Sequence, residues 1–176
     1  MIPKMDASLY SVPLTGLREG THDYEFICGD AFFKEMGNTD ETQAELQVHA
    51  QIINQSSRLQ LKLTYNGVLH LQCDRCLISY AKPVVLSESF WISAGEILRI
   101  EDQIILVPVG TDRLNLSQHM YETLMLQVPM RKVPCEDDIG TELNCDTTVL
   151  QSLHGISDIK DTKELEYWNT LKKLKP

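Results

Sequence analysis

The sequence predicts an α+β fold, in which an antiparallel, strongly bent sheet or partly open barrel carries two or three packed helices. Apolar and polar residues alternate over most of the first 108 residues, which is the period of half-buried strands. Helical spacing then appears at 115–128 and again at 162–174. Because the connections between the predicted strands are too short for crossovers, neighbouring strands are expected to run antiparallel.

The predicted strands are separated by turn residues. The turn "NQSS" at 54–57 lies between two strongly alternating stretches. The next turn signal, "YNG" at 65–67, predicts a hairpin with a three-residue loop and a left-handed Gly67. That loop pairs Leu63 with Leu69 and keeps the apolar face on one side. The stretches with strand character are 8–17, 23–28, 44–52, 58–65, 68–73, 82–94 and 103–109.

The helices complete a single predicted domain. Asn115 is expected to cap the first helix, with Gln118 completing a capping box, and Pro129 to end it. Residues 1–135 should form the β-rich core with the helix near 115–128, and 136–176 an acidic loop and a C-terminal helix packed on the same domain. The predicted core comprises Leu61, Leu63, Leu69, Leu71, Leu86, Phe90, Leu124 and Trp168.

Composition restricts the protein class. The chain has 176 residues, of which 43% are apolar, and a formal net charge of −9. It contains no apolar run near the roughly 20 residues that span a bilayer, and its start lacks a secretory signal. We therefore expect a soluble, cytoplasmic protein with no membrane partner. An acidic chain contacts nucleic acid only through a local basic patch, or holds a basic protein instead.

The cysteines are the first candidate site. An odd count of five, without an export signal, argues against a disulfide framework. Cys73 and Cys76 have the spacing of one zinc knuckle, and Cys135 and Cys145 supply a second pair, so the four are candidate zinc ligands. Two unconnected thiol pairs remain the alternative. A thiol-redox couple is less favoured, because the pair follows a strand and no βαβ pattern surrounds it.

Basic side chains form the second candidate site. Arg75 projects from the turn between the two cysteines, where a fixed guanidinium suits phosphate contact or an acidic partner surface. The alternative is that Arg75 only pairs with a carboxylate such as Asp74 or Glu88. Lys82 is a further candidate near the same turn. The candidate contact residues are Arg75, Arg58, Lys62, Arg131 and Lys132.

The sequence carries no recognisable enzyme signature. It lacks the G-x-S-x-G, P-loop, G-x-G-x-x-G and H-E-x-x-H motifs, and its histidines are scattered. We therefore expect a protein that is not an enzyme and has no small-molecule substrate. Two alternatives stay open. One is a thiol-redox or metal-dependent enzyme that uses the Cys73–Cys76 pair, and the other is a zinc-clipped protein-interaction module.

Three segments together resemble the YceD family, the bacterial large ribosomal RNA subunit accumulation proteins. They are "CDRCL" at 73–77, "LNLSQHMYETLMLQVPMRKVPC" at 114–135 and "DTKELEYWNTLKKLK" at 161–175. The resemblance implies a non-enzymatic factor that supports the synthesis, processing or stability of 23S ribosomal RNA. The implied partner is the large-subunit RNA precursor or a basic ribosomal protein, and the second of these suits the charge of −9.

Overall fold

The computed structural model describes residues 9–37, 43–55 and 58–134, together with 146, 148, 149 and 152. The chain divides into two compact units. The first comprises Met1–Leu71 and Ala81–Met130, and the second comprises Gln72–Tyr80 and Arg131–Pro176. The predicted C-terminal helix and its Trp168 therefore lie outside the described residues, as does almost all of the predicted acidic loop.

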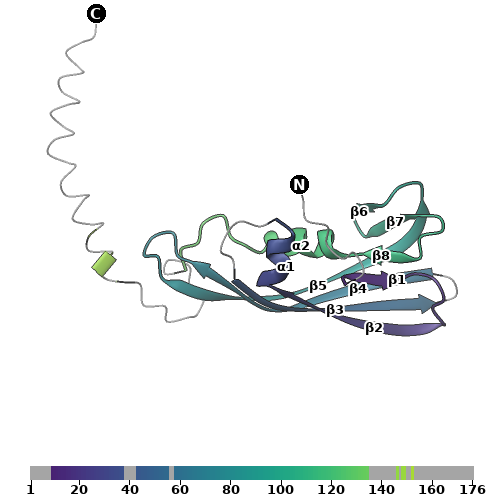
Figure 1. The fold of residues 1–176 in the computed structure, drawn as a ribbon, viewed down its shortest axis with the longest axis horizontal. Helices are drawn as coiled ribbons and strands as arrows, with labels where there is room; N and C mark the ends of the chain where they lie inside the picture. Colours follow the sequence, from purple (N-terminus) through teal and green to yellow (C-terminus); the bar gives the residue numbers. More distant parts are fainter. Residues whose placement is uncertain are drawn as a thin grey trace, which may run out of the picture. The chain divides into compact units, whose positions relative to one another are not determined.

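A six-stranded sheet forms the body of the first unit, with the strand order β2-β3-β4-β5-β7-β6 (Figure 1). A separate two-stranded sheet pairs β1 with β8. The strands are β1 (Ser11–Pro13), β2 (Gly20–Gly29), β3 (Gln43–Gln55), β4 (Arg58–Gln72), β5 (Ser79–Gly95), β6 (Arg99–Glu101), β7 (Ile104–Pro108) and β8 (Arg113–Asn115). The helices are α1 (Asp30–Glu35) and α2 (Ser117–Met125).

The alternating pattern of the sequence produces the core as predicted. On β3, alternate residues from Leu46 to Ile52 are buried, while those between them face outward. On β4, Leu61 and Leu63 are fully buried. Gln55, the last residue of β3, pairs with Arg58, the first residue of β4, and residues 56 and 57 of the predicted "NQSS" turn lie outside the described residues. The buried members of the predicted core are Leu61, Leu63, Leu69, Leu71, Phe90 and Leu124; Leu86 is half-buried.

The predicted hairpin at 65–67 is wrong, because β4 runs unbroken through this segment. Gly67 pairs with Leu46 of β3 and Tyr65 with Val48, so the segment is strand throughout. A Cβ on Gly67 would lie 2.1 Å from the carbonyl oxygen of Glu45. Glycine is therefore needed here for a close approach of two backbones, rather than for a turn.

The predicted α+β class with two or three packed helices is also wrong. The four longest strands have 10 to 17 residues, whereas α1 has six and α2 has nine. The described residues form a mainly β structure, with an open sheet whose edges are β2 and β6. A short helix of this kind covers only part of a sheet, so strand-to-strand pairing dominates the architecture.

The sheet is mixed rather than purely antiparallel, because β5 and β7 run parallel with Trp91 beside Ile104. No helical crossover was needed. The chain leaves β5, returns along β6 at the edge, and then turns back as β7 between β5 and β6. The short strand β6 thus carries the chain back to the start of β7, as a parallel neighbour of β5 requires. The prediction of a purely antiparallel sheet, which was based on short connections, is therefore wrong.

Helices α1 and α2 lie on the same side of the sheet (Figure 1). Phe33 of α1 contacts Tyr121 of α2 with 6.0 Å between ring centroids, and His119 of α2 contacts Phe90 of β5 edge-on. The capping prediction is wrong, because the N-cap position of α2 is Leu116, which makes no side-chain cap hydrogen bond. The side chain of Asn115 accepts a hydrogen bond from the backbone N–H of Ser117, but Gln118 donates to Glu122 instead of closing a capping box.

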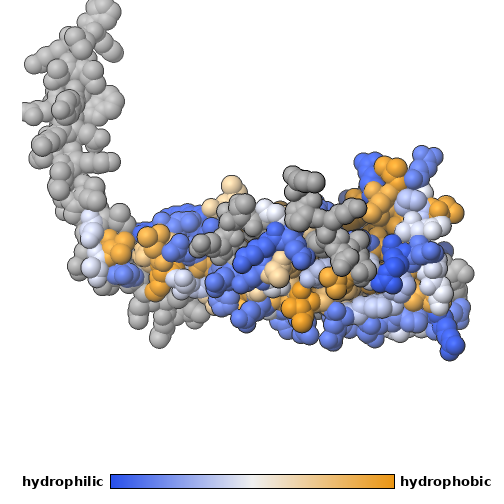
Figure 2. Space-filling view, in the orientation of Figure 1, coloured by the Kyte–Doolittle hydropathy of each residue, from blue (hydrophilic) through white to orange (hydrophobic). Residues whose placement is uncertain are grey.

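Apolar side chains are exposed around β6 and β7, and Figure 2 shows them as orange surface over this part of the first unit. Ile97 and Leu98 lie in the connection before β6, and Val109 follows β7. The edge strand β6 itself is short and carries an ion pair between Arg99 and Glu101. Short charged edge strands are a common protection against unwanted strand pairing.

Candidate functional site

The Cys73–Cys76 turn, residues 73–78, is closed by backbone hydrogen bonds. The N–H of Cys73 donates to the carbonyl of Ile78 at 2.9 Å, and the N–H of Leu77 donates to the carbonyl of Cys73 at 3.0 Å. Leu77 has a φ of 60°, the left-handed conformation that glycine usually supplies after a zinc knuckle. The chain therefore forms a knuckle-like turn although no glycine follows the second cysteine.

The backbone points N–H groups at both sulfurs of this turn. The N–H of Arg75 donates to Sγ of Cys73 at 3.5 Å. Hydrogen bonds from the backbone of Ile78 and then of Asp146 hold the pKa of Cys76 below its usual range, because they favour the thiolate. Both cysteines are buried as free thiols. Sulfurs with this environment suit a metal-bound thiolate.

The segment after α2 is fastened to the same turn within the second unit. The N–H of Asp74 donates to the carbonyl of Lys132 at 2.8 Å, and the N–H of Lys132 donates to Oδ2 of Asp74 at 2.7 Å. Buried Val133 forms a small apolar cluster with Cys73 and Cys76. The turn and residues 131–134 thus form one folded element.

The structure describes two of the four predicted zinc ligands. Cys73 and Cys76 lie together in the turn, whereas Cys135 and Cys145 lie outside the described residues. Asp146, the residue directly after Cys145, reaches the sulfur of Cys76 through its backbone. Within the described part of the chain, no group of three or more metal-binding side chains is found. The described pair fits one half of a tetrahedral thiolate site.

The predicted basic residues fall in both units. Arg75 and Lys132 are half-buried and Arg131 is exposed, all within the second unit. Arg58 and Lys62 are exposed on β4 in the first unit.

Lys82, the further candidate near the turn, is engaged elsewhere. It donates from Nζ to the carbonyl of Gln127. Three of the predicted contact residues, Arg75, Arg131 and Lys132, therefore belong to the second unit, which contains the turn.

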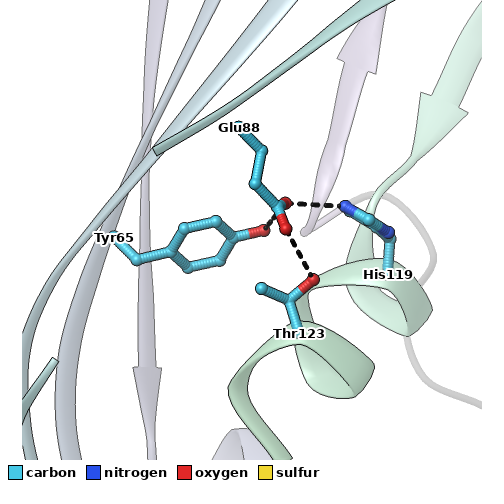
Figure 3. Close-up of polar contacts among 4 residues, drawn as sticks. All are labelled: Tyr65, Glu88, His119 and Thr123. Atoms are coloured by element: carbon cyan, nitrogen blue, oxygen red, sulfur yellow. Dashed lines mark hydrogen bonds and ion pairs between the residues drawn. The ribbon is translucent and has the colours of Figure 1, made fainter. Parts of the chain in front are cut away.

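A polar cluster on the inner face of the sheet was missed by the sequence analysis (Figure 3). Glu88 of β5 accepts hydrogen bonds from the hydroxyl of Tyr65 at 3.3 Å and from Thr123 at 3.4 Å. Its Oε2 also lies 3.0 Å from Nε2 of His119. Burial, and then the nearby Glu88 charge, raise the pKa of Tyr65 far above its ordinary value.

This cluster fastens α2 to the sheet, because His119 and Thr123 come from the helix and Glu88 and Tyr65 from the strands. A sequence signal for it existed. Glu88 shares the parity of the apolar residues Leu86 and Phe90, so it had to face inward. An inward carboxylate requires hydrogen-bond donors, and these four residues satisfy one another.

A comparison with models of protein families gives a match over most of the chain. The family model described as "Large ribosomal RNA subunit accumulation protein YceD" matches residues 61–175. A search of curated proteins and a search of solved structures found no match. Among the described residues, no helix is long and apolar enough to cross a membrane.

Proposed function

The chain belongs to the YceD family, and on that premise we propose that it is a non-enzymatic factor that supports the synthesis, processing or stability of 23S ribosomal RNA. The family's description gives the role in large-subunit RNA accumulation. The contact surface that we propose is the Cys73–Cys76 turn with residues 131–134. We expect the protein to act in the cytoplasm, where this RNA is made and assembled.

The observation that supports this surface best is the double hydrogen bond between Asp74 and Lys132. It fixes two cation-bearing segments of the second unit to each other. Residues 72–80 and 131–134 carry three cations, Arg75, Arg131 and Lys132, against the carboxylate of Asp74, and Asp146, whose backbone reaches Cys76, adds a second carboxylate. The whole chain, in contrast, has a charge of −9. A local cationic element on an acidic protein is suited to phosphate contact.

A structural zinc ion is part of the proposal, with Cys73, Cys76, Cys135 and Cys145 as its ligands. The support is the donor chemistry of the described pair, whose sulfurs already receive backbone hydrogen bonds. When bound, such an ion ties distant segments together and contributes folding free energy. Metal analysis of protein purified without chelators should give about one zinc per chain. Cys135→Ser and Cys145→Ser should each lower that ratio, and a ratio near zero for the wild type would refute the zinc site.

A basic ribosomal protein is the second candidate partner, and the charge of −9 favours it. Direct RNA binding predicts a defined salt dependence for variants of Arg75. If RNA is bound directly, Arg75→Ala should weaken binding to a labelled large-subunit RNA transcript and reduce the salt slope by about one. Arg75→Lys should keep the slope.

Arg99→Ala is the matched control, because it removes one exposed cation from the β6 edge. It should leave both affinity and slope unchanged. If the purified wild-type protein fails to bind the transcript but retains a basic ribosomal protein, direct RNA contact is refuted and the second partner is favoured. Co-purification with neither would favour an interaction module unrelated to ribosomes.

A further inference from the structure

Leu77 combines two unfavourable properties in one residue. Its φ of 60° is one of only two left-handed non-glycine conformations in the described part of the chain. Its side chain is 61% exposed, so it gains little from burial in the free protein. A left-handed conformation is costly for a residue with a branched side chain and free for glycine.

The turn requires the backbone conformation of Leu77 but not its side chain. The N–H of Leu77 donates to the carbonyl of Cys73, and its own carbonyl accepts from the side chain of Gln72 at 3.0 Å. Both bonds involve only the backbone of Leu77. Glycine in its place would make them without strain. The leucine side chain therefore needs an explanation outside the folding of this turn, and strained residues of this kind concentrate at functional sites.

The surroundings of Leu77 point to a ligand that is both anionic and apolar. Arg75 lies two residues before it, and Lys132 is fastened to Asp74 of the same turn. Arg131 precedes Lys132 and is exposed. An exposed apolar side chain beside cations matches an unpaired nucleotide, which offers a flat apolar base and a phosphate. A surface of carboxylates alone would satisfy the cations but not the leucine.

We propose that Leu77 is an RNA-contact residue, whose side chain packs against an unstacked base while Arg75 and Lys132 contact the neighbouring phosphates. The inference rests on the proposed function and extends it to single-stranded or looped RNA. The strained turn presents the leucine before binding, so little conformational freedom is lost when RNA binds.

Leu77→Gly separates the two properties of the residue. It should raise the Tm by about 2 °C, because the left-handed strain is relieved. It should also raise the Kd for a labelled single-stranded RNA about fivefold to tenfold, because an apolar contact is lost. The salt slope should stay unchanged, since no phosphate contact is removed. Leu77→Met should bind like the wild type.

Asp102→Gly is the control, because Asp102 is the other left-handed residue, with a φ of 49°. It should also raise the Tm and leave RNA binding unchanged. Equal affinity of wild type and Leu77→Gly would overturn the proposal, as would a lower Tm in Leu77→Gly, which would assign the side chain a structural role. A wild-type protein that binds no RNA in either form would refute the proposed RNA contact itself.

Discussion

Asp74 and Lys132 are joined by two hydrogen bonds although 58 residues separate them in the chain. One bond links the N–H of Asp74 to the Lys132 carbonyl, and the other links the N–H of Lys132 to the Asp74 carboxylate. The second bond uses the carboxylate of Asp74, so a substitution of Asp74 removes it. Through this pair, the turn between the cysteines and the segment after α2 become one element.

Asp74→Ala should loosen residues 131–134 from the turn. The backbone N–H of Lys132 loses its carboxylate acceptor, and because this bond is exposed the loss costs about 0.5–1.5 kcal/mol of local stability. Hydrogen exchange of the Lys132 amide should accelerate, while amides of β3 keep their protection. Glu96→Gln, which alters an exposed carboxylate of the first unit, serves as control and should change neither. An unchanged exchange rate at Lys132 in Asp74→Ala would contradict the fastening role.

Gly67→Ala should be strongly destabilising, by roughly 3 kcal/mol or more, because the strands would have to separate. The new Cβ would lie 2.1 Å from the carbonyl oxygen of Glu45 and 2.7 Å from Cα of Leu46. Gly110→Ala is the control, because Gly110 also has a positive φ, 88° against 152° for Gly67, but has open space around the new Cβ. It should cost about 1 kcal/mol. Equal losses in chemical denaturation would show that β3 and β4 do not approach so closely.

Cys28 should make the first unit sensitive to alkaline pH. Burial raises the pKa of its thiol to about 12, whereas the thiol of an unfolded cysteine has a pKa of about 8.5. Between these values the unfolded chain loses a proton that the folded chain keeps. The free energy of unfolding therefore falls as pH rises, by about 1.4 kcal/mol per pH unit for this group.

This effect is tested by the slope of the unfolding free energy against pH, rather than by the unfolding free energy at one pH. Cys28→Ala should reduce the pH dependence between about 9 and 12 by close to one proton. Val48→Ala, a truncation at another fully buried position, should lower stability without changing the slope. If both variants keep the wild-type slope, the Cys28 thiol is not protected from ionisation in the folded protein.

Glu88 and Tyr65 should be energetically coupled. Tyr65→Phe removes one of the donors to the Glu88 carboxylate and should cost about 1 kcal/mol. In Glu88→Gln the same tyrosine change should cost less, and the double-mutant cycle should give about 0.5–1.5 kcal/mol of coupling. Tyr24→Phe, a half-buried tyrosine of β2, should show coupling near zero with Glu88→Gln. A coupling free energy of zero between Tyr65→Phe and Glu88→Gln would contradict a stabilising hydrogen bond between the two side chains.

Alternation alone was enough to identify the inner face of the sheet. Leu61, Leu63, Leu69 and Leu71 were expected in the core and are buried, because side chains on a strand can face only two ways. The same parity, followed through Tyr65 and Gly67, already indicated one unbroken strand. The turn signal of Asn66–Gly67 competes with this continuity. Local turn propensity was overruled by pairing with β3.

The parallel pairing of β5 with β7 was beyond reach from the sequence. It depends on where β6 lies relative to its neighbours, and a three-residue edge strand carries almost no periodic signal. The cysteine turn was predicted from spacing, but its fastening by Asp74 to Lys132 is a contact between distant segments. No local pattern encodes such a contact, although Asp74 was visible as a side chain able to accept it.

The central claim is that the element formed by the Cys73–Cys76 turn and residues 131–134 supports large-subunit RNA accumulation. The most direct test measures the ratio of 23S to 16S ribosomal RNA in cells depleted of the protein and supplied with variants at equal levels. We predict that wild type and Arg99→Ala restore the ratio, whereas the double variant Arg75→Ala/Lys132→Ala leaves it low. A ratio that does not change on depletion, or full restoration by the double variant, would contradict the account.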